Sequence, residues 1–296
     1  MIRAQDLRKV YGDLVAVDGI SLEIQRGEAF GLLGPNGAGK TTTIHMLVGA
    51  LSPDAGQIEM DGAADATRPD IRRRIGVAPQ TLSLYEELTG AENLAFFGRM
   101  YRVRGGRLKE RVAWGLAFAG LTERASDRVK TYSGGMKRRL NLACALVHDP
   151  AVLFLDEPTV GVDPQSRNYI FENIETLKQQ GCTVVYTTHY MEEAQRLCDR
   201  VAIMDHGKVL ALDAVETLID RHGGASVIEA ELERPPADAS ALPGRLDGTS
   251  LRIETERPLE VTAELTALGI RFLSLRIRRP DLETVFLALT GRSLRD

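Results

Sequence analysis

The stretch that decides the fold of this 296-residue chain is Gly34-Pro35-Asn36-Gly37-Ala38-Gly39-Lys40-Thr41, with Thr42 directly after it. It matches the pattern G-x-x-x-x-G-K-[ST] and lies between an apolar run, Ala29 to Leu33, and a helical pattern, Lys40 to Ala50. Glycines let backbone N–H groups converge on phosphate oxygens, and the start of a helix presents its positive dipole end to the same anion. Lys40 is therefore predicted to contact the outer phosphates of a nucleotide, and Thr41 to ligate Mg²⁺. The alternative is a chance match in a tight strand–helix turn.

A second part of the same site is predicted where the apolar run Val152 to Leu155 ends in Asp156 and Glu157. An acidic side chain buried at the end of a strand is costly unless it is paired, and a metal ion would offset that cost. Asp156 is the candidate Mg²⁺ partner. Glu157 faces another direction and is the candidate that polarises an attacking water. A carboxylate that caps a helix at Pro158 is the alternative.

The strand and helix patterns around these motifs predict an α/β fold. Leu14 to Ile24 is predicted to form two short strands joined by a turn at Asp18-Gly19. A second apolar run, Val184 to Tyr186, follows a helical segment that Asp163-Pro164 opens with a cap and a proline. Fully apolar strands separated by helices are typical of a parallel sheet that is covered on both faces.

Two further regions differ from this pattern. Residues 81–132 read as mostly helical and start with the capping-box pattern Thr89-Gly90-Ala91-Glu92. A boundary is predicted near Arg221 to Gly224, and the segment of about 75 residues beyond it is long enough for a small α+β domain. Alternating apolar positions predict three strands, at Ile228, Ala230 and Leu232, at Leu251 and Ile253, and at Leu273, Leu275 and Ile277. Apolar positions on one helix face predict a helix at Val261, Leu265 and Leu268. A closing helix is predicted at Leu282, Val285, Phe286 and Leu289, and it ends at Gly291.

The composition excludes several classes of protein. Lys and Arg total 37 against 41 for Asp and Glu, so the chain lacks the basic excess of a dedicated nucleic-acid binder, and no nucleic-acid partner is predicted. No apolar run approaches the roughly 20 residues that span a bilayer. Three cysteines indicate buried small side chains in a reducing compartment rather than a disulfide framework. We therefore expect a cytosolic chain that needs a partner for any task at a membrane.

Taken in order, the motifs of residues 1 to about 220 resemble those of the ATP-binding subunits of ABC transporters. The series is Tyr11, the loop Gly34 to Thr41, Gln80, the signature loop Tyr132-Ser133-Gly134-Gly135-Met136, Asp156-Glu157, Asp163 and His189. Each motif by itself has an ordinary structural explanation, whereas the ordered set is specific.

The resemblance assigns a role to each motif. It places Tyr11 against adenine, Gln80 at the nucleotide and the metal, and His189 near the γ-phosphate, so that Lys40, Glu157 and His189 form the catalytic set. It implies that Ser133, Gly134 and Gly135 bind the nucleotide of a second subunit, and that Asp163 contacts that subunit. In this family two subunits meet head to tail on ATP and Mg²⁺, and hydrolysis loosens the dimer. The signature loop departs from the common form at Tyr132, where Leu is usual, and at Met136, where Gln is usual.

The resemblance also implies an architecture. Residues 1–222 would form the ATP-binding cassette, an α/β P-loop fold with a mixed core sheet, an antiparallel β subdomain and a helical subdomain at about 81–150. Residues 223–296 would form a small α+β accessory domain that regulates the subunit or only packs against it. The segment from Thr81 to Thr89 would line a groove for a membrane partner, with Leu84 and Tyr85 as apolar contacts or, alternatively, as helical core.

The stretches Tyr186 to Ala194 and Pro280 to Arg292 resemble the branch of daunorubicin/doxorubicin-resistance and sodium-export ATPases. In that branch a separate permease crosses the membrane. The expected function is thus ATP hydrolysis that powers drug, antibiotic or lipid-like export at the cytoplasmic face of the membrane. The second subunit would be another copy or a paralogue, and the cargo stays open. The alternative, a soluble ABC ATPase of DNA repair or translation, typically carries a coiled-coil insertion or a tandem cassette, and neither is found here.

Overall fold

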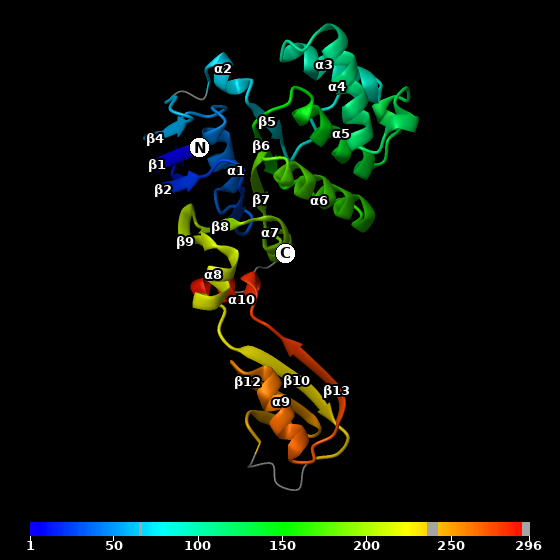
Figure 1. The fold of residues 1–296 in the computed structure, drawn as a ribbon. Coiled ribbons are helices and arrows are strands. Elements are labelled where there is room, and N and C mark those ends of the chain that lie inside the picture. Colours follow the sequence, from blue (N-terminus) through cyan, green and yellow to red (C-terminus); the bar gives the residue numbers. More distant parts are fainter. Residues whose placement is uncertain (65–66, 236–241, 292–296) are drawn as a thin grey trace. The chain divides into compact units, whose positions relative to one another are not determined.

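The computed structural model describes residues 1–64, 67–235 and 242–291 (Figure 1). These residues form two compact units, Met1–Val215 and a second unit that starts at Glu216. The division between the units falls at the start of helix α8 (Val215–His222), seven residues before the boundary predicted after residue 222, which stays a prediction. Arg292 and the residues after it lie outside the described residues.

A six-stranded sheet forms the centre of the first unit. Its strands lie in the order β5 (Ile75–Ala78), β6 (Val152–Asp156), β7 (Thr183–Thr188), β3 (Ala29–Leu33), β8 (Arg200–Asp205) and β9 (Lys208–Ala214). The first five are parallel and β9 pairs antiparallel with β8. All residues of β3, β6 and β7 are buried, as the apolar runs predict for strands covered on both faces.

Helices from the intervening segments cover this sheet. They are α1 (Lys40–Leu47), which packs on β6, α5 (Gly134–Leu146) on β5, α6 (Pro164–Gln179) on β7, and α7 (Met191–Leu197) on β3 and β7. Helix α6 begins as predicted, because Asp163 accepts a hydrogen bond from the backbone N–H of Ser166 and a proline occupies the first turn.

A separate antiparallel sheet lies beside the core, with strand order β2 (Leu14–Ile24), β1 (Ile2–Tyr11) and β4 (Ala55–Met60). The predicted turn at Asp18-Gly19 is wrong, because β2 continues through it. Gly19 has φ +73°, and the pairing with β1 shifts there, so it forms a β-bulge. Its positive φ explains the error, since a glycine that suits a tight turn suits a bulge equally well.

The helical subdomain consists of α3 (Gly90–Met100), α4 (Gly105–Phe118) and α5, with short 3₁₀ turns at Thr122–Arg124 and Val129–Thr131; the short helix α2 (Pro69–Arg72) precedes β5. The capping box predicted for α3 is confirmed, with Thr89 and Glu92 exchanging side-chain and backbone hydrogen bonds. Its core includes Leu94, Leu140 and Val147. The mixed sheet, the antiparallel sheet and the helical layer together confirm the α/β class.

The second unit holds a four-stranded antiparallel sheet in the order β11 (Arg245–Asp247), β12 (Ser250–Thr255), β10 (Ser226–Leu232) and β13 (Phe272–Arg278), together with α9 (Pro258–Ala267) and α10 (Leu282–Thr290). Leu265 on α9 packs with the inward residues of β10 and β12 in one core. Leu268 does not share that face as predicted; it follows the end of α9 and is 68% exposed. Helix α10 ends at Gly291 with φ +71°, as expected.

Candidate nucleotide-hydrolysis site

The loop between β3 and α1 needs glycine for two physical reasons. Gly37 and Gly39 have φ of +82° and +100°, values that other residues rarely adopt. A Cβ on Gly34 would lie 2.2 Å from the carbonyl oxygen of Met204, so the loop also passes too close to backbone for a side chain. Gly39 caps α1 without a side-chain hydrogen bond, which leaves N–H groups of the first turn for an anion. Pro35, Asn36 and Ala38 complete this loop, and Thr42 lies in the first turn of α1.

The Lys40 side chain is buried, 5% exposed, and folds back over the loop. Its Nζ donates to the carbonyl oxygens of Gly34 at 2.8 Å and Pro35 at 3.1 Å, and forms an ion pair with Glu157 Oε1 at 3.1 Å. The ammonium thus lies within the loop that is predicted to bind the outer phosphates of a nucleotide.

Asp156 ends β6 beside the start of α1. Its Oδ1 accepts hydrogen bonds from the hydroxyls of Thr41 at 3.2 Å and Thr187 at 2.6 Å, and the residue is 3% exposed. Thr187 reaches it because Asp156 and Thr187 are register partners of the parallel strands β6 and β7. A buried carboxylate is thus satisfied by two hydroxyl donors.

Glu157 is the residue on which the other site groups converge. Its Oε1 lies 3.1 Å from Lys40 Nζ and 3.3 Å from His189 Nδ1, while its Oε2 accepts from Gln80 Nε2 at 3.2 Å. The residue has φ +46° and is 5% exposed, and its N–H donates to the Thr187 hydroxyl at 2.9 Å. Three side chains and a left-handed backbone thus fix the direction of the carboxylate that the sequence predicts to polarise an attacking water.

The donors in this cluster suit Mg²⁺ when ATP is bound. Mg²⁺ keeps several waters and takes one or two carboxylates plus substrate phosphates, so it does not need a cage of acidic side chains. Asp156, the Thr41 hydroxyl and the Gln80 amide are of the required type. The described residues contain no group of three or more His, Cys, Asp or Glu that could hold a metal by themselves.

The signature loop begins α5. Ser133 accepts a hydrogen bond from the N–H of Met136 at 3.2 Å, and Ser133 and Gly134 are exposed. Gly135 is buried, and a Cβ there would lie 2.2 Å from Ser166 Oγ and 2.7 Å from Asp163 Oδ2. The second glycine therefore lets the signature loop pack against the start of α6.

The unusual residue of the signature loop, Tyr132, belongs to the helical core. It is 5% exposed, and its hydroxyl donates to the carbonyl oxygen of Arg124 at 2.6 Å. A Cβ on Gly90 would come within 2.5 Å of the same hydroxyl, so the Tyr132 side chain fits only because residue 90 has no side chain. The departure from leucine thus changes internal packing rather than the exposed surface.

Tyr11, Asp163 and Ser133 lie apart from the Glu157 cluster. Tyr11, at the end of β1, is 48% exposed, and Lys9 Nζ lies 5.9 Å from the centre of its ring. Hydrogen bonds from the Ser166 N–H, then from its hydroxyl, lower the pKa of Asp163 below its ordinary value. Within the described part of the chain, neither of these residues nor Ser133 forms a hydrogen bond or ion pair with the cluster.

Sequence reasoning missed residues that position the cluster, among them Thr187 and Arg138. Thr187 bridges Asp156 and the Glu157 backbone, and the hydroxyls in the otherwise apolar strand were the signal that could have found it. Arg138 on α5 is 8% exposed and donates to the carbonyl oxygens of Gln80 at 2.7 Å and Val160 at 3.4 Å. Nothing in a helical pattern separates such a buried arginine from a solvated one.

A glycine-rich loop at a helix start, beside a carboxylate that ends the neighbouring strand and a glutamate held by lysine and histidine, defines a nucleoside-triphosphate hydrolase of the P-loop class. The chain belongs to the ABC transporter family as an ATP-binding ATPase. The family model described as ABC transporter matches residues 17–160. The chain is 44% identical over 311 residues to the linearmycin resistance ATP-binding protein LnrL of Bacillus subtilis, with both chains covered in full. It is 42% identical to the Nod factor export ATP-binding protein I of Cupriavidus metallidurans, covering 100% of this chain and 99% of that one.

Solved structures agree with this assignment. An ATP-binding subunit of an ABC transporter superposes with a TM-score of 0.69 at 30% identity, covering 75% of this chain and 93% of the other. A dimeric ATP-binding cassette bound to ADP and Pi in a post-hydrolysis state gives 0.67 at 27% identity, with 72% and 98% covered. The family expected from the ordered motifs is confirmed. No helix in the described residues has the length and apolar character needed to cross a membrane.

Proposed function

We propose that this chain is the motor subunit of an exporter: it pairs head to tail with a second cassette on Mg²⁺-ATP and drives a separate permease at the cytoplasmic face of the membrane. The observation that carries the proposal is the convergence of Lys40, Gln80 and His189 on Glu157. The full-length similarity to proteins named for antibiotic resistance and Nod factor export supports the exporter role and a drug-like or lipid-like cargo.

The geometry supports a different role for each site residue during hydrolysis. Glu157 accepts the proton of the attacking water, while His189 and Gln80, one on each carboxylate oxygen, fix the direction of that carboxylate. Lys40 and the loop N–H groups offset the charge that develops on the phosphates. Mg²⁺, held by Asp156 and the Thr41 hydroxyl, would supply further charge neutralisation at the phosphates.

A nucleotide bound between two copies explains the exposed signature loop. Ser133 and Gly134 stand at the start of α5, a 13-residue helix whose first N–H groups can bind an anion. In the head-to-tail dimer they close on the nucleotide of the other copy, while Tyr11 stacks on the adenine of the nucleotide bound to its own copy. Loss of the γ-phosphate removes these contacts and shifts the population toward open subunits.

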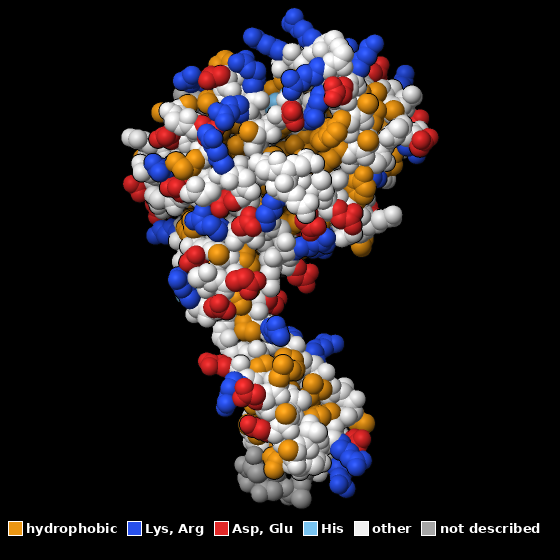
Figure 2. Space-filling view, in the orientation of Figure 1, with side chains coloured by type: hydrophobic (Ala, Val, Ile, Leu, Met, Phe, Trp, Pro, Cys, Tyr) orange, Lys and Arg blue, Asp and Glu red, His pale blue; other side chains and the backbone are white. Residues whose placement is uncertain are grey.

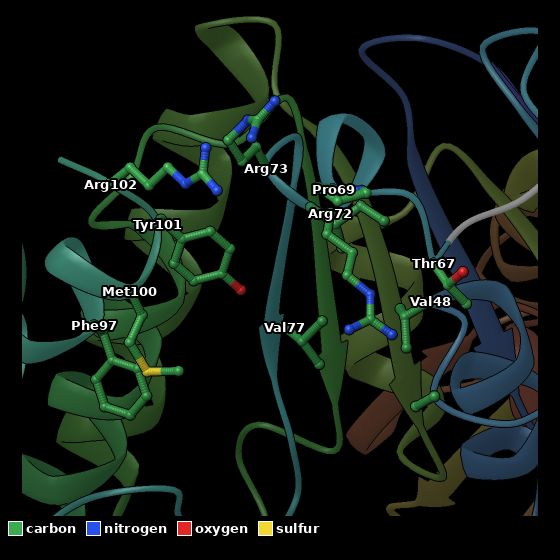
Figure 3. Close-up of a pocket in the computed structure, with 12 residues that line it drawn as sticks. Val48, Thr67, Pro69, Arg72, Arg73, Val77, Phe97, Met100, Tyr101 and Arg102 are labelled. Carbon is green, nitrogen blue, oxygen red and sulfur yellow. The ribbon is translucent and has the colours of Figure 1, made fainter.

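A groove in the cassette supports docking of the permease. It has a volume of about 610 Å³ and is lined by Val48, Ala50, Thr67, Pro69, Arg72, Arg73, Ile75, Val77, Phe97, Met100, Tyr101 and Arg102. Figure 3 shows the end of α3 forming one wall, with the Tyr101 hydroxyl pointing into the cavity and Val77 at its centre. In Figure 2, hydrophobic side chains are visible in a hollow near the top of the molecule, with Lys and Arg side chains around it. An amphipathic helix with acidic ends fits such a surface.

The segment from Thr81 to Thr89, which the sequence places at a groove for the membrane partner, is absent from the lining of this groove. Leu84 packs into the helical core, which was one of its two predicted placements. Tyr85 is 50% exposed, with its ring centre 4.7 Å from that of Phe96. The apolar lining comes instead from β5, from the end of α3, and from Val48, Ala50 and Pro69.

The dimer is tested with Glu157→Gln, which keeps the shape but removes the base. We expect this variant to bind ATP and accumulate as an ATP-dependent dimer in light scattering, whereas Lys40→Ala should bind no nucleotide. Glu192→Gln, the same change at an exposed position of α7, is the matched control and should behave as the wild type. A Glu157→Gln protein that binds ATP and stays monomeric would count against the mechanism.

Permease docking is tested with Met100→Glu, which places a charge on the groove lining. The amount of the variant that cosediments with membrane vesicles from the source organism should fall, while the rate of ATP hydrolysis by the purified variant should not. Leu14→Glu, at a similarly exposed apolar side chain (65% against 66% for Met100) outside the groove, is the control. Recovery of the wild type only with ribosomes or DNA would favour the alternative, a soluble ABC ATPase.

A further inference from the structure

A fully buried carboxylate, Glu193, lies behind the hydrolysis site. It is 1% exposed and sits in the first turn of α7, four positions after His189. Removing a carboxylate from water costs several kcal/mol unless it is well paired, so a protein keeps one only where its hydrogen bonds are satisfied. Glu193 takes no part in the hydrolysis described above.

Both oxygens of this carboxylate are satisfied. Oε2 accepts from the hydroxyls of Tyr186 at 2.8 Å and Thr188 at 2.9 Å. Oε1 accepts from the hydroxyl of Thr159 at 2.8 Å and forms an ion pair with Arg167 Nε at 3.0 Å. Burial, together with the charge of Glu193, raises the pKa of Tyr186 well above its ordinary value, so the phenol remains a donor.

The partners lie on the two segments that carry the reacting groups. Thr159 follows Glu157 by two positions, and Thr188 directly precedes His189. The Thr188 hydroxyl also accepts from the N–H of Tyr190 at 2.9 Å, so the backbone on both sides of the histidine is fixed. One side chain therefore ties the segment after β6 to the segment after β7.

The ion pair extends this support to the histidine ring. The Arg167 guanidinium lies 5.5 Å from the centre of the Tyr190 ring, and that ring centre lies 4.1 Å from the His189 ring centre. His189 thus contacts both the Tyr190 ring and Glu157, whose Oε1 lies 3.3 Å from its Nδ1. Arg167, which pairs with Glu193, contacts the ring that packs against His189.

We propose that Glu193 is a positioning residue that holds Glu157 and His189 at their mutual distance without touching the nucleotide. This inference rests on the proposed roles of those two residues. In Glu193→Gln an amide nitrogen replaces one of the two oxygens, each of which accepts from two groups. An amide nitrogen donates and cannot accept, so the hydroxyl groups that donated to the replaced oxygen must turn away. The Thr159 and Thr188 segments are then no longer fixed to one point, and a misplacement of about 1 Å at a reacting group costs up to about 100-fold in rate.

The test measures ATP hydrolysis by the full-length chain, expressed per bound nucleotide. Binding stoichiometry of a fluorescent ATP analogue gives the fraction of intact sites. For Glu193→Gln we expect kcat per site to fall at least about 10-fold. The KM for ATP should stay within about two-fold, because the loop from Gly34 to Thr41 is untouched. Glu192→Gln, its exposed neighbour, controls for the loss of charge.

The outcomes separate positioning from simple stabilisation. If kcat falls only in proportion to the binding stoichiometry, or if kcat per site is unchanged, the proposal is refuted. Should Glu193→Gln fail to fold, Thr159→Val and Thr188→Val each remove one of the two links and must show the same selective loss. Glu157→Gln measured in parallel identifies failure of the underlying function: if it hydrolyses ATP as the wild type does, the roles assigned to the site are wrong, whatever Glu193 does.

Discussion

Acid should destabilise the first unit through one histidine, His148, which lies two residues after the end of α5. Its Nε2 hydrogen-bonds the carbonyl oxygen of Ile75 on β5 at 3.0 Å, and its ring stacks on Tyr101 at 3.6 Å between centres. Nδ1 is buried and has no hydrogen-bond partner among the described residues. The ring is therefore held neutral, with its proton on the nitrogen that faces Ile75, between the helical subdomain and the core sheet.

The magnitude follows from the pKa. Burial is the main cause that lowers the pKa of His148 from 6.5 to about 4. The unfolded chain then binds the proton more readily than the folded one, so stability is complete above pH 6.5 and is lost as the pH falls toward 4. Between pH 7.5 and pH 5 the loss is about 2 kcal/mol, and it approaches about 3 kcal/mol below pH 4.

The assay is urea unfolding of the wild type and His148→Gln at pH 7.5, 6 and 5. Trp114, the one tryptophan of the chain, lies on α4 in the same helical subdomain and reports this transition by fluorescence. Gln cannot titrate, so the difference in unfolding free energy between the two proteins isolates His148 from all other groups. His45→Gln, at an exposed histidine of α1, is the control.

The wild type should lose about 2 kcal/mol relative to His148→Gln on going from pH 7.5 to pH 5. A difference that stays constant over this range would refute the reasoning, because it would mean that the folded protein accepts the proton as easily as the unfolded chain. If the unfolding free energy of His45→Gln differs from that of the wild type with the same pH dependence, the effect is not specific to the buried His148.

Three further outcomes are expected. Tyr132→Phe should lower the unfolding free energy by about 1–3 kcal/mol through loss of the bond to the Arg124 carbonyl, with unchanged ATPase kcat; a matching loss of activity would contradict the assignment of this signature residue to the core. Gly34→Ala should abolish binding of a fluorescent ATP analogue, because its Cβ would lie 2.2 Å from a backbone oxygen, and binding at wild-type affinity would show that the loop can move aside. Thr187→Val should cost about 1.5–3 kcal/mol in thermal unfolding by removing a 2.6 Å bond to the carboxylate that ends β6; a loss below about 0.5 kcal/mol would show that this bond contributes little.

Local patterns were sufficient for much of the fold. The caps at Thr89 and Asp163 were readable because a cap depends on residues only a few positions apart. The apolar runs of β3, β6 and β7 were readable because strands covered on both faces need no alternation. The error at Gly19 arose because a positive φ serves turns and bulges alike, and only pairing with β1 distinguishes them.

The candidate site was predictable as a set of positions but not as an arrangement. The sequence by itself determined the glycine-rich loop, the carboxylates after β6 and the histidine after β7, since each follows from chemistry within a short segment. Only the tertiary structure decided that Glu157 receives Lys40, Gln80 and His189 together, and that Glu193 ties the segments behind them. The reason is that these contacts depend on strand order and register, which place β6 and β7 side by side with Asp156 opposite Thr187. Side chains more than 30 positions apart meet there, and no periodicity within one segment records such a meeting.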